Sequence, residues 1–418
     1  MLERRWRIAL FTTLYLYQGL VAGFATTALV NHFAATGFPA AEVGRHLAVV
    51  GLPWVLQPLL WGPLIDGAAP RRMGTRRFWL VLALVGAQAS LSGLCILGSA
   101  PSLAAVSAVL FLHSLFASLA DTATDRMLAD TVPESELGRT SACTRAGFVV
   151  GSAIGAGLFG WWLGAAGFAQ AATGLLAITT ALVVGAGLVR EAPGDALVAA
   201  GRGREPAKGR SASFGPVVSF VGRIGRAAGS FRDREAALLL LMCFGTDFAL
   251  ALFQVPFGVA LVQERGWEPA ALSSLQAGLG LVAGTVGAAA MGLYVDRAGP
   301  ARALLTLLLA CAAAFAAAAC LIAAGWGDRM GPLILGLSSV VPALLYVALL
   351  PTVVLASRAQ GASATQFQIL MAAMNLGDVV GALVAGEVDR RLGPALTACG
   401  VALFLISFAA IRARPAQR

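Results

Sequence analysis

Long apolar segments separated by short charged stretches dominate this sequence, and each is close to the roughly 20 residues that a helix needs to cross a bilayer. Charged residues make up 12% of the chain, about half of the roughly 25% that soluble globular proteins carry. Because the few charges are gathered between the apolar segments, the pattern predicts an all-α membrane protein that crosses the bilayer many times.

The apolar segments predict twelve transmembrane helices, an even number that places both termini on the same side of the membrane. They are centred on residues 8–30, 46–65, 78–99, 102–124, 142–163, 168–189, 237–261, 271–294, 301–324, 332–355, 365–387 and 393–411.

The basic residues predict the orientation of these segments. With the termini inside, 24 of the 30 lysines and arginines lie in cytoplasmic stretches and 5 lie outside. Positively charged loops stay in the cytoplasm, so both termini are expected there. The same rule explains the net charge of +9 without a nucleic-acid partner, and we expect none.

One long polar stretch divides the chain into two parts. We expect a six-helix half over residues 1–190, a cytoplasmic linker over 191–235 and a second six-helix half over 236–418. Residues 214–231 of the linker alternate apolar side chains with arginines, which predicts an amphipathic helix on the lipid surface.

A repeated pattern links the two halves. The run from Gly62 to Asp66 returns as Gly292 to Asp296, 230 positions later, and Gly147 has its counterpart in Gly377 at the same offset. Two landmarks at one offset indicate a duplicated half. Many transporters build a central, alternately accessible site from such a duplicated bundle.

The second copy of this turn closely resembles the G-x-x-x-D-R-x-G-R signature of the major facilitator superfamily. It reads Asp296-Arg297-Ala298-Gly299 and is followed by Arg302, whereas the first copy has Gly67 in place of the arginine. The resemblance implies twelve helices in two pseudo-symmetric halves and a cytoplasmic gate latch. The alternative is a pair of ordinary helix ends with orienting arginines. The gate residues implied are Gly62, Asp66, Arg76, Gly292, Asp296 and Arg297.

Residues 45–157 are similar to the AmpG-type branch of that superfamily. The similarity lies in Leu60-Trp61-Gly62-Pro63-Leu64-Ile65-Asp66, in Gly74 to Trp79 and in the block around Asp121 and Asp125. The branch implies uptake permeases for muropeptides or ferric siderophores, or carriers of acetyl-CoA. This chain departs from it at Val149, where the branch has an arginine. The compact length favours the siderophore type.

Arg145 is a charged residue inside a predicted span, which is costly and marks a functional site. We expect it to attract an anionic group of the substrate or a carboxylate within the membrane. The alternative is that it reaches the cytoplasmic interface near Arg139. Other polar residues of the spans are expected to bind the substrate with it: Gln18, Tyr17, Gln254, Asn375 and Gln368.

Four aspartates are candidates for proton coupling. Asp121 and Asp125 are four residues apart and share a helix face, where two close carboxylates favour an exchangeable proton. The alternative is that both are solvated or paired with arginines at the cytoplasmic edge. Asp247 and Asp378 have no basic residue within a turn, so either can exchange a proton or hydrogen-bond to an amide side chain.

Two glycine patterns predict close helix contacts, Gly147-x-x-x-Gly151-x-x-x-Gly155 and Gly280-x-x-x-Gly284. The six cysteines lie in or beside apolar segments without C-x-x-C spacing, so we expect neither a metal site nor a cofactor.

Together these features predict a transporter of the bacterial inner membrane. Because the sequence has no phosphate-binding loop, ATP is not expected to drive it directly, and we expect a secondary transporter. We expect a monomer among membrane lipids that imports a bulky polar small molecule with a proton. A ferric siderophore is the first candidate substrate, and an anhydromuropeptide is the second. A transporter-like solute sensor is the alternative of another class. An enzyme is not expected, since nothing resembles a nucleophile elbow or a metal motif.

Overall fold

The computed structural model describes residues 4–66, 72–190, 195–197, 234–359 and 364–413, and its regular elements there are helical. In lipid, a helix satisfies its own backbone hydrogen bonds, which explains why these apolar segments take this form. The elements are α1 (Arg4–Gly23), η1 (Phe24–Ala28), α2 (Leu29–Ala35), α3 (Ala40–Asp66), α4 (Thr75–Ile96), α5 (Leu103–Thr131), α6 (Glu134–Ala166), α7 (Phe168–Gly187), α9 (Arg234–Gln263), α10 (Pro269–Ala298), α11 (Pro300–Ala323), α12 (Gly327–Ser338), α13 (Val341–Ala359) and α14 (Ala364–Ala413).

Ten stretches of the described residues are helical, long and apolar enough to cross a membrane. Two features separate this number from the predicted twelve. The predicted second segment is the 27-residue helix α3, which is not among the ten. The predicted eleventh and twelfth segments are joined in α14, where Gly393 has a φ of 72° and breaks the helical backbone. Twelve spans with cytoplasmic termini therefore stay a prediction.

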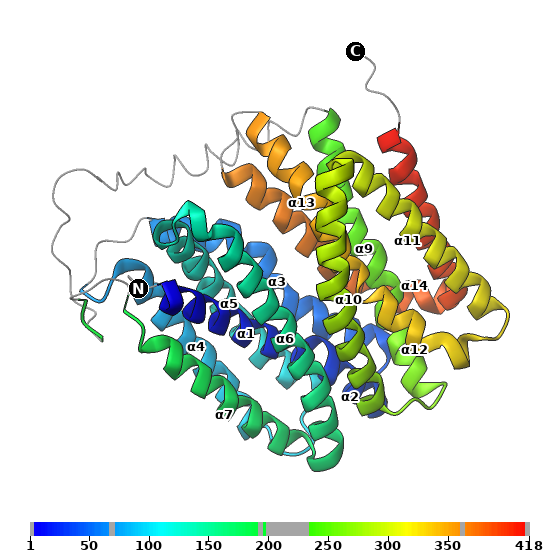
Figure 1. Ribbon diagram of the computed structural model, residues 1–418. Coiled ribbons are helices and arrows are strands. Elements are labelled where there is room, and N and C mark those ends of the chain that lie inside the picture. The colour runs from blue at the N-terminus through cyan, green and yellow to red at the C-terminus, as the bar shows by residue number, and fades with distance from the viewer. Residues whose placement is uncertain (1–3, 67–71, 191–194, 198–233, 360–363, 414–418) are drawn as a thin grey trace.

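Helices α1 to α7 form an N-terminal bundle and helices α9 to α14 form a C-terminal bundle (Figure 1). We call one end of the molecule the basic end. Helices α1, α4 and α9 begin there, and α10 ends there at Ala298, next to Arg297. In Figure 1 the two bundles diverge toward their basic ends, with α1 starting at the left and α9 at the top. They converge near α2 and the start of α10, which we call the opposite end.

Glycines bring two pairs of helices into backbone contact, one pair in each bundle. A Cβ atom on Gly147 would lie 2.6 Å from the carbonyl oxygen of Thr12, so α6 touches α1 directly. A Cβ atom on Gly377 would lie 2.0 Å from the carbonyl oxygen of Phe244, so α14 touches α9. The glycines that echo each other in sequence therefore occupy equivalent helix contacts in the two bundles.

The second glycine pattern behaves differently, and its predicted helix contact is wrong. A Cβ atom on Gly280 or Gly284 would meet no other heavy atom within 4 Å. Both glycines instead line the cavity between the bundles. Their small size leaves space there and does not serve helix packing.

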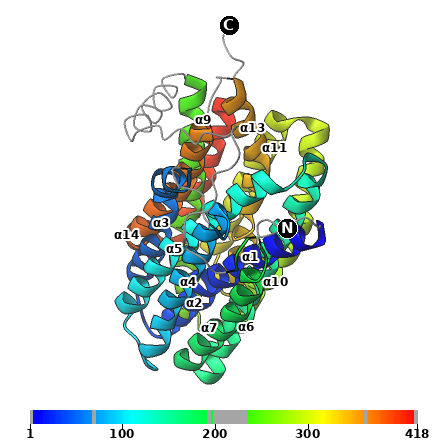
Figure 2. The same cartoon turned by 90° about the vertical axis from the view of Figure 1, so that its left-hand side faces the viewer.

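Close packing also joins the two bundles near their opposite ends. Gly44 of α3 lies against the backbone of Ala382 in α14, and Gly386 lies against the backbone of Ala41. Gly160 of α6 lies against Ser273 of α10. Figure 2 shows α3 and α14 side by side from a second direction. These contacts hold the bundles together at the opposite end.

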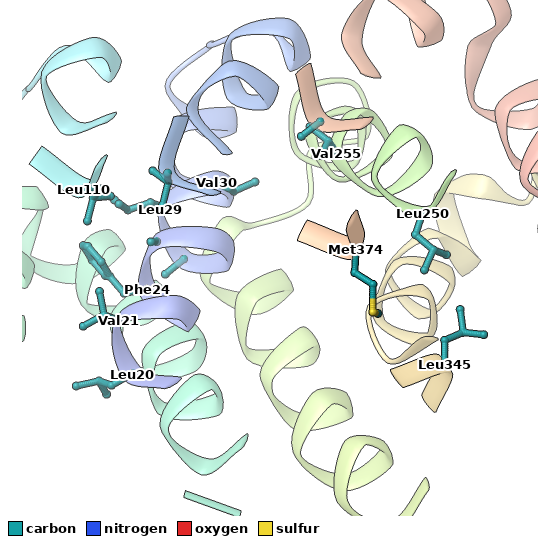
Figure 3. Packing of buried hydrophobic residues seen from close by; sticks show 14 of the residues in the cluster. Leu20, Val21, Phe24, Leu29, Val30, Leu110, Leu250, Val255, Leu345 and Met374 are labelled. Atoms are coloured by element: carbon teal, nitrogen blue, oxygen red, sulfur yellow. The ribbon is translucent and has the colours of Figure 1, made fainter. Parts of the chain in front are cut away.

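Large apolar side chains fill the interior of each bundle (Figure 3). Phe24 packs edge-on against Phe159 with ring centroids 5.6 Å apart, and Phe253 stacks on Phe257 at 4.8 Å. This packing fixes the helices that carry the polar residues of the cavity.

At the basic end of the N-terminal bundle, arginines form ion pairs and hydrogen bonds that connect neighbouring helices. Arg7 of α1 donates to Glu136 of α6 at 2.6 Å, and Arg76 of α4 pairs with Asp130 of α5. The buried Arg77 donates to the carbonyl oxygen of Gly187, the last residue of α7, at 2.5 Å. It also donates to the carbonyl oxygen of Leu197, which follows α7 in the chain, at 2.7 Å. These contacts of Arg76 and Arg77 join parts of the N-terminal bundle to one another.

Candidate functional site

A cavity of about 390 Å³ lies between the two bundles. Its N-terminal wall is formed by η1, α2, α3 and α6, and its C-terminal wall by α9, α10, α12, α13 and α14. Polar side chains on its walls include Thr26, Asn31, Gln254, Gln276 and Ser339. The cavity therefore offers hydrogen-bonding groups from both bundles to one enclosed solute.

Two irregular helical segments contribute to these walls. Thr26 and Thr27 belong to the π-helical turn η1, which interrupts the first predicted span. Ser339 and Val340 separate α12 from α13 within the predicted tenth span. Gln254 donates to the carbonyl oxygen of Ser338 at 2.8 Å, which satisfies an acceptor released by this break. Irregular turns of this kind are frequent at functional sites.

Arg145 of α6 is on the cavity wall and is exposed to it. Within the described chain, no carboxylate lies within ion-pair distance of its guanidinium group. The guanidinium carbon instead lies 5.6 Å from the ring centroid of Phe148 and 5.8 Å from that of Tyr346. Tyr346 belongs to α13, so this arginine is held between aromatic rings from both bundles.

Asp378 of α14 lines the same cavity and is exposed. Because Gly377 lies against the α9 backbone at Phe244 and Phe248, Asp378 is next to the turn of α9 that carries Asp247. The two carboxyl groups are within electrostatic range of each other. The buried Oδ1 atom of Asp247 has no hydrogen-bond partner among the described residues. Two aspartates that are distant in sequence thus form one acidic patch.

The other two aspartates are held by hydrogen bonds inside the N-terminal bundle. Asp121 accepts from the amide of Gln18 at 3.0 Å and from that of Gln57 at 2.8 Å. Asp125 accepts from the hydroxyl of Tyr15 at 2.6 Å. These partners come from α1 and α3, so three helices contribute to this cluster. Tyr346 lies within electrostatic range of both aspartates and of Arg145.

Amide side chains tie the bundles together at the opposite end. Asn31 is buried and donates to Ser273 Oγ at 2.8 Å and to Gln276 Oε1 at 2.9 Å. Gln263 of α9 donates to the carbonyl oxygens of Ala34 and Phe38 at 2.9 and 2.8 Å. We call these four hydrogen bonds the polar latch.

The remaining predicted substrate residues have other surroundings. Tyr17 is 2% exposed and packs beside the ring of His113 with centroids 6.1 Å apart, behind the cavity wall. Asn375 donates to the carbonyl oxygen of Trp54 at 3.2 Å, which links α14 to α3. The side chain of Gln368 lies outside the described residues.

The predicted gate residues are at the basic end, on helices of different bundles. Asp296 and Arg297 are exposed in the last turn of α10, where a cation interacts favourably with the helix dipole. A Cβ atom on Gly292 would meet nothing within 4 Å. Gly62 and Asp66 belong to the last turns of α3, and their side chains lie outside the described residues.

Sequence reasoning missed Asn31 and Tyr346. Asn31 is a polar residue within an apolar segment, and this signal was sufficient to select it. Tyr346 carries no comparable signal, since tyrosine is common in spans and its neighbours Asp125 and Arg145 come from other helices.

The sequence profile of the Major Facilitator Superfamily matches residues 9–354. The chain belongs to this superfamily. It is therefore a multi-pass membrane transporter, as the resemblance at Asp296 and Arg297 implied.

A curated relative of this superfamily member is the anhydromuropeptide permease of Escherichia coli. The two are 25% identical over 264 residues, which are 62% of this chain and 49% of the permease. The alignment thus spans about half the length of that relative. The similarity agrees with the AmpG-type resemblance of residues 45–157.

Solved transporter structures share the fold of this superfamily member. The nucleoside transporter NupG has a TM-score of 0.64 at 15% identity, covering 97% of this chain and 98% of that one. A POT family transporter in complex with a thioalcohol-conjugated peptide has a TM-score of 0.68 at 13% identity, covering 98% and 95%. At this level of identity the likeness shows the architecture alone.

Proposed function

We propose that the chain is a secondary transporter that imports a bulky polar solute bearing an anionic group. The observation that carries this proposal is the position of Arg145 on the wall of the cavity between the bundles, without a carboxylate partner among the described residues. An unpaired charge in the membrane interior is costly. A negatively charged solute offsets this cost, and rocking of the bundles carries the solute across.

The import is proposed to be coupled to protons through Asp121, Asp125, Asp247 and Asp378. Asp121 and Asp125 share one hydrogen-bonded cluster, and Asp247 adjoins Asp378 on the cavity wall. Neighbouring carboxylates repel each other when both are ionised, so each pair favours retention of one proton. A change of shape that alters their surroundings releases it.

Two substrates fit this proposal. A ferric siderophore is the first candidate, because residues 45–157 resemble the AmpG-type branch, which includes uptake permeases for ferric siderophores. An anhydromuropeptide is the second candidate, and the similarity to the Escherichia coli permease favours it. Both are bulky polar molecules of the kind that amide and hydroxyl groups on the walls can bind.

The test is uptake of labelled ferric siderophore and labelled anhydromuropeptide by proteoliposomes that contain the full chain, with and without an inward proton gradient. Arg145→Ala is expected to lower uptake at least tenfold, while Arg139→Ala, an exposed arginine outside the cavity lining, leaves it unchanged. Equal uptake by Arg145→Ala and the unaltered chain contradicts the assignment. If the proteoliposomes bind the labelled solute but do not exchange it across the membrane in a counterflow assay, the protein is a solute sensor.

A further inference from the structure

The charges on the cavity wall define a class of substrate within the proposed function. Among the described residues that line the cavity, the two charged side chains are Arg145 and Asp378. They have opposite signs and come from opposite bundles, α6 and α14. Both are exposed to the cavity, and no ion pair joins either to the other or to another described side chain.

Local structure keeps each charge away from competing partners. The guanidinium group of Arg145 is held between the rings of Phe148 and Tyr346, and the nearby Asp125 is engaged by Tyr15. Asp378 is backed by Asp247, whose buried Oδ1 has no partner among the described residues. The two carboxyl groups favour retention of one proton between them, so the pair supplies one negative charge to the acidic wall.

Between these charges the walls carry uncharged groups. Gln254, Gln276 and Ser339 supply amides and a hydroxyl, and apolar side chains such as Leu335 and Val340 complete the lining. A solute that lies across the cavity meets a cation on one side, neutral hydrogen-bonding groups between, and an anion on the other.

We propose that the cavity selects zwitterionic solutes, with an anionic group on Arg145 and an ammonium group on Asp378. A solute with negative charge alone satisfies Arg145 and leaves Asp378 without a counter-charge, so the aspartate must take up a proton. A zwitterion neutralises both walls and gains a charge-assisted hydrogen bond at each. This inference rests on the proposed function and narrows its substrate to molecules with a free amino group.

Binding of a matched pair of probes to the full purified chain tests the inference. The probes are an anhydromuramyl peptide with a free amino group and the same compound acetylated on that amine. Loss of one charged hydrogen bond is expected to weaken binding of the acetylated form about tenfold or more. In Asp378→Asn the two forms are expected to bind within about threefold of each other, and Asp378→Glu restores the preference.

Controls separate this inference from the proposed function. Asp378→Asn is expected to bind the acetylated probe at least as tightly as the unaltered chain does, because the aspartate that lacks a counter-charge has been removed, and this binding also shows that the variant is folded. If the unaltered chain transports both probes without preference, or prefers a ferric tris-catecholate, which carries negative charge alone, the zwitterion inference is wrong and the transporter proposal stands. If neither the peptide nor the siderophore is transported, the proposed function fails and this inference falls with it.

Discussion

At the scale of single residues, Arg145 illustrates how a costly charge is kept available inside a membrane protein. Its guanidinium group contacts aromatic faces at 5.6 and 5.8 Å and makes no ion pair with a described carboxylate. An aromatic face attracts a cation without supplying a counter-charge. The arginine thus stays in place and can still receive an anionic solute.

Tyr346 is expected to act as a positioning residue for this arginine. Tyr346→Leu removes the ring and lets Arg145 turn toward Asp125, so the KM for an anionic solute should rise roughly three- to thirtyfold with little change in kcat. Tyr346→Phe keeps the ring and should retain the KM of the unaltered chain. Initial uptake rates over a range of solute concentrations measure both constants. A Phe variant as impaired as the Leu variant would assign the effect to the hydroxyl group.

The sequence could identify Arg145 and Asp378, because a charge in an apolar segment is visible without a structure. It could not show that they share a cavity or that Asp378 adjoins Asp247, since this depends on how α9 and α14 pack, with Gly377 against Phe244 and Gly381 against Phe248. The amide partners of Asp121 are likewise determined by the register of three helices.

At the scale of helices, backbone contact depends on what faces a glycine. Gly147, Gly151 and Gly155 lie against α1, whereas Gly280 and Gly284 have the same spacing and face open space. The spacing of the glycines shows only that one face of the helix lacks side chains. Whether another helix covers that face follows from the arrangement of the whole bundle.

Substitution of Gly151 by alanine is expected to weaken the contact of α6 with α1. The added Cβ atom would lie 2.2 Å from a backbone oxygen that cannot rotate away, and such overpacking costs about 1–3 kcal/mol. Gly185→Ala in α7 is the control, because nothing lies within 4 Å of its Cβ position. Thermal unfolding in detergent should show a lower Tm for the first variant alone. Equal Tm values would mean that α6 can shift without loss of packing.

At the scale of the whole molecule, the polar latch and the glycine contacts join the bundles at one end, and the bundles diverge at the other (Figure 1). The cavity lies between. An alternating mechanism requires that these bonds break when the opposite end opens. The polar latch therefore contributes directly to the equilibrium between the state that is closed at the opposite end and the state that is open there.

Asn31→Leu is expected to shift that balance toward opening at the opposite end. It removes two hydrogen bonds of about 0.5–1.5 kcal/mol each, which changes the ratio of states roughly 5- to 150-fold. Spin labels at the exposed Thr36 and Ala324, in a chain whose six cysteines are replaced, report the separation. Thr173→Val removes a bond within α7 and is the control. An unchanged distance distribution in Asn31→Leu would show that glycine packing alone closes this end.

Arg77 has a further consequence for how the two bundles move. By holding the carbonyl oxygens of Gly187 and Leu197, it fixes the chain to the N-terminal bundle up to Leu197. Residues 198–233, which include the amphipathic helix predicted over 214–231, lie outside the described residues, and the C-terminal bundle begins at Arg234. A swing of one bundle against the other is therefore expected to leave Leu197 in place beside α7, because a buried arginine holds its carbonyl oxygen.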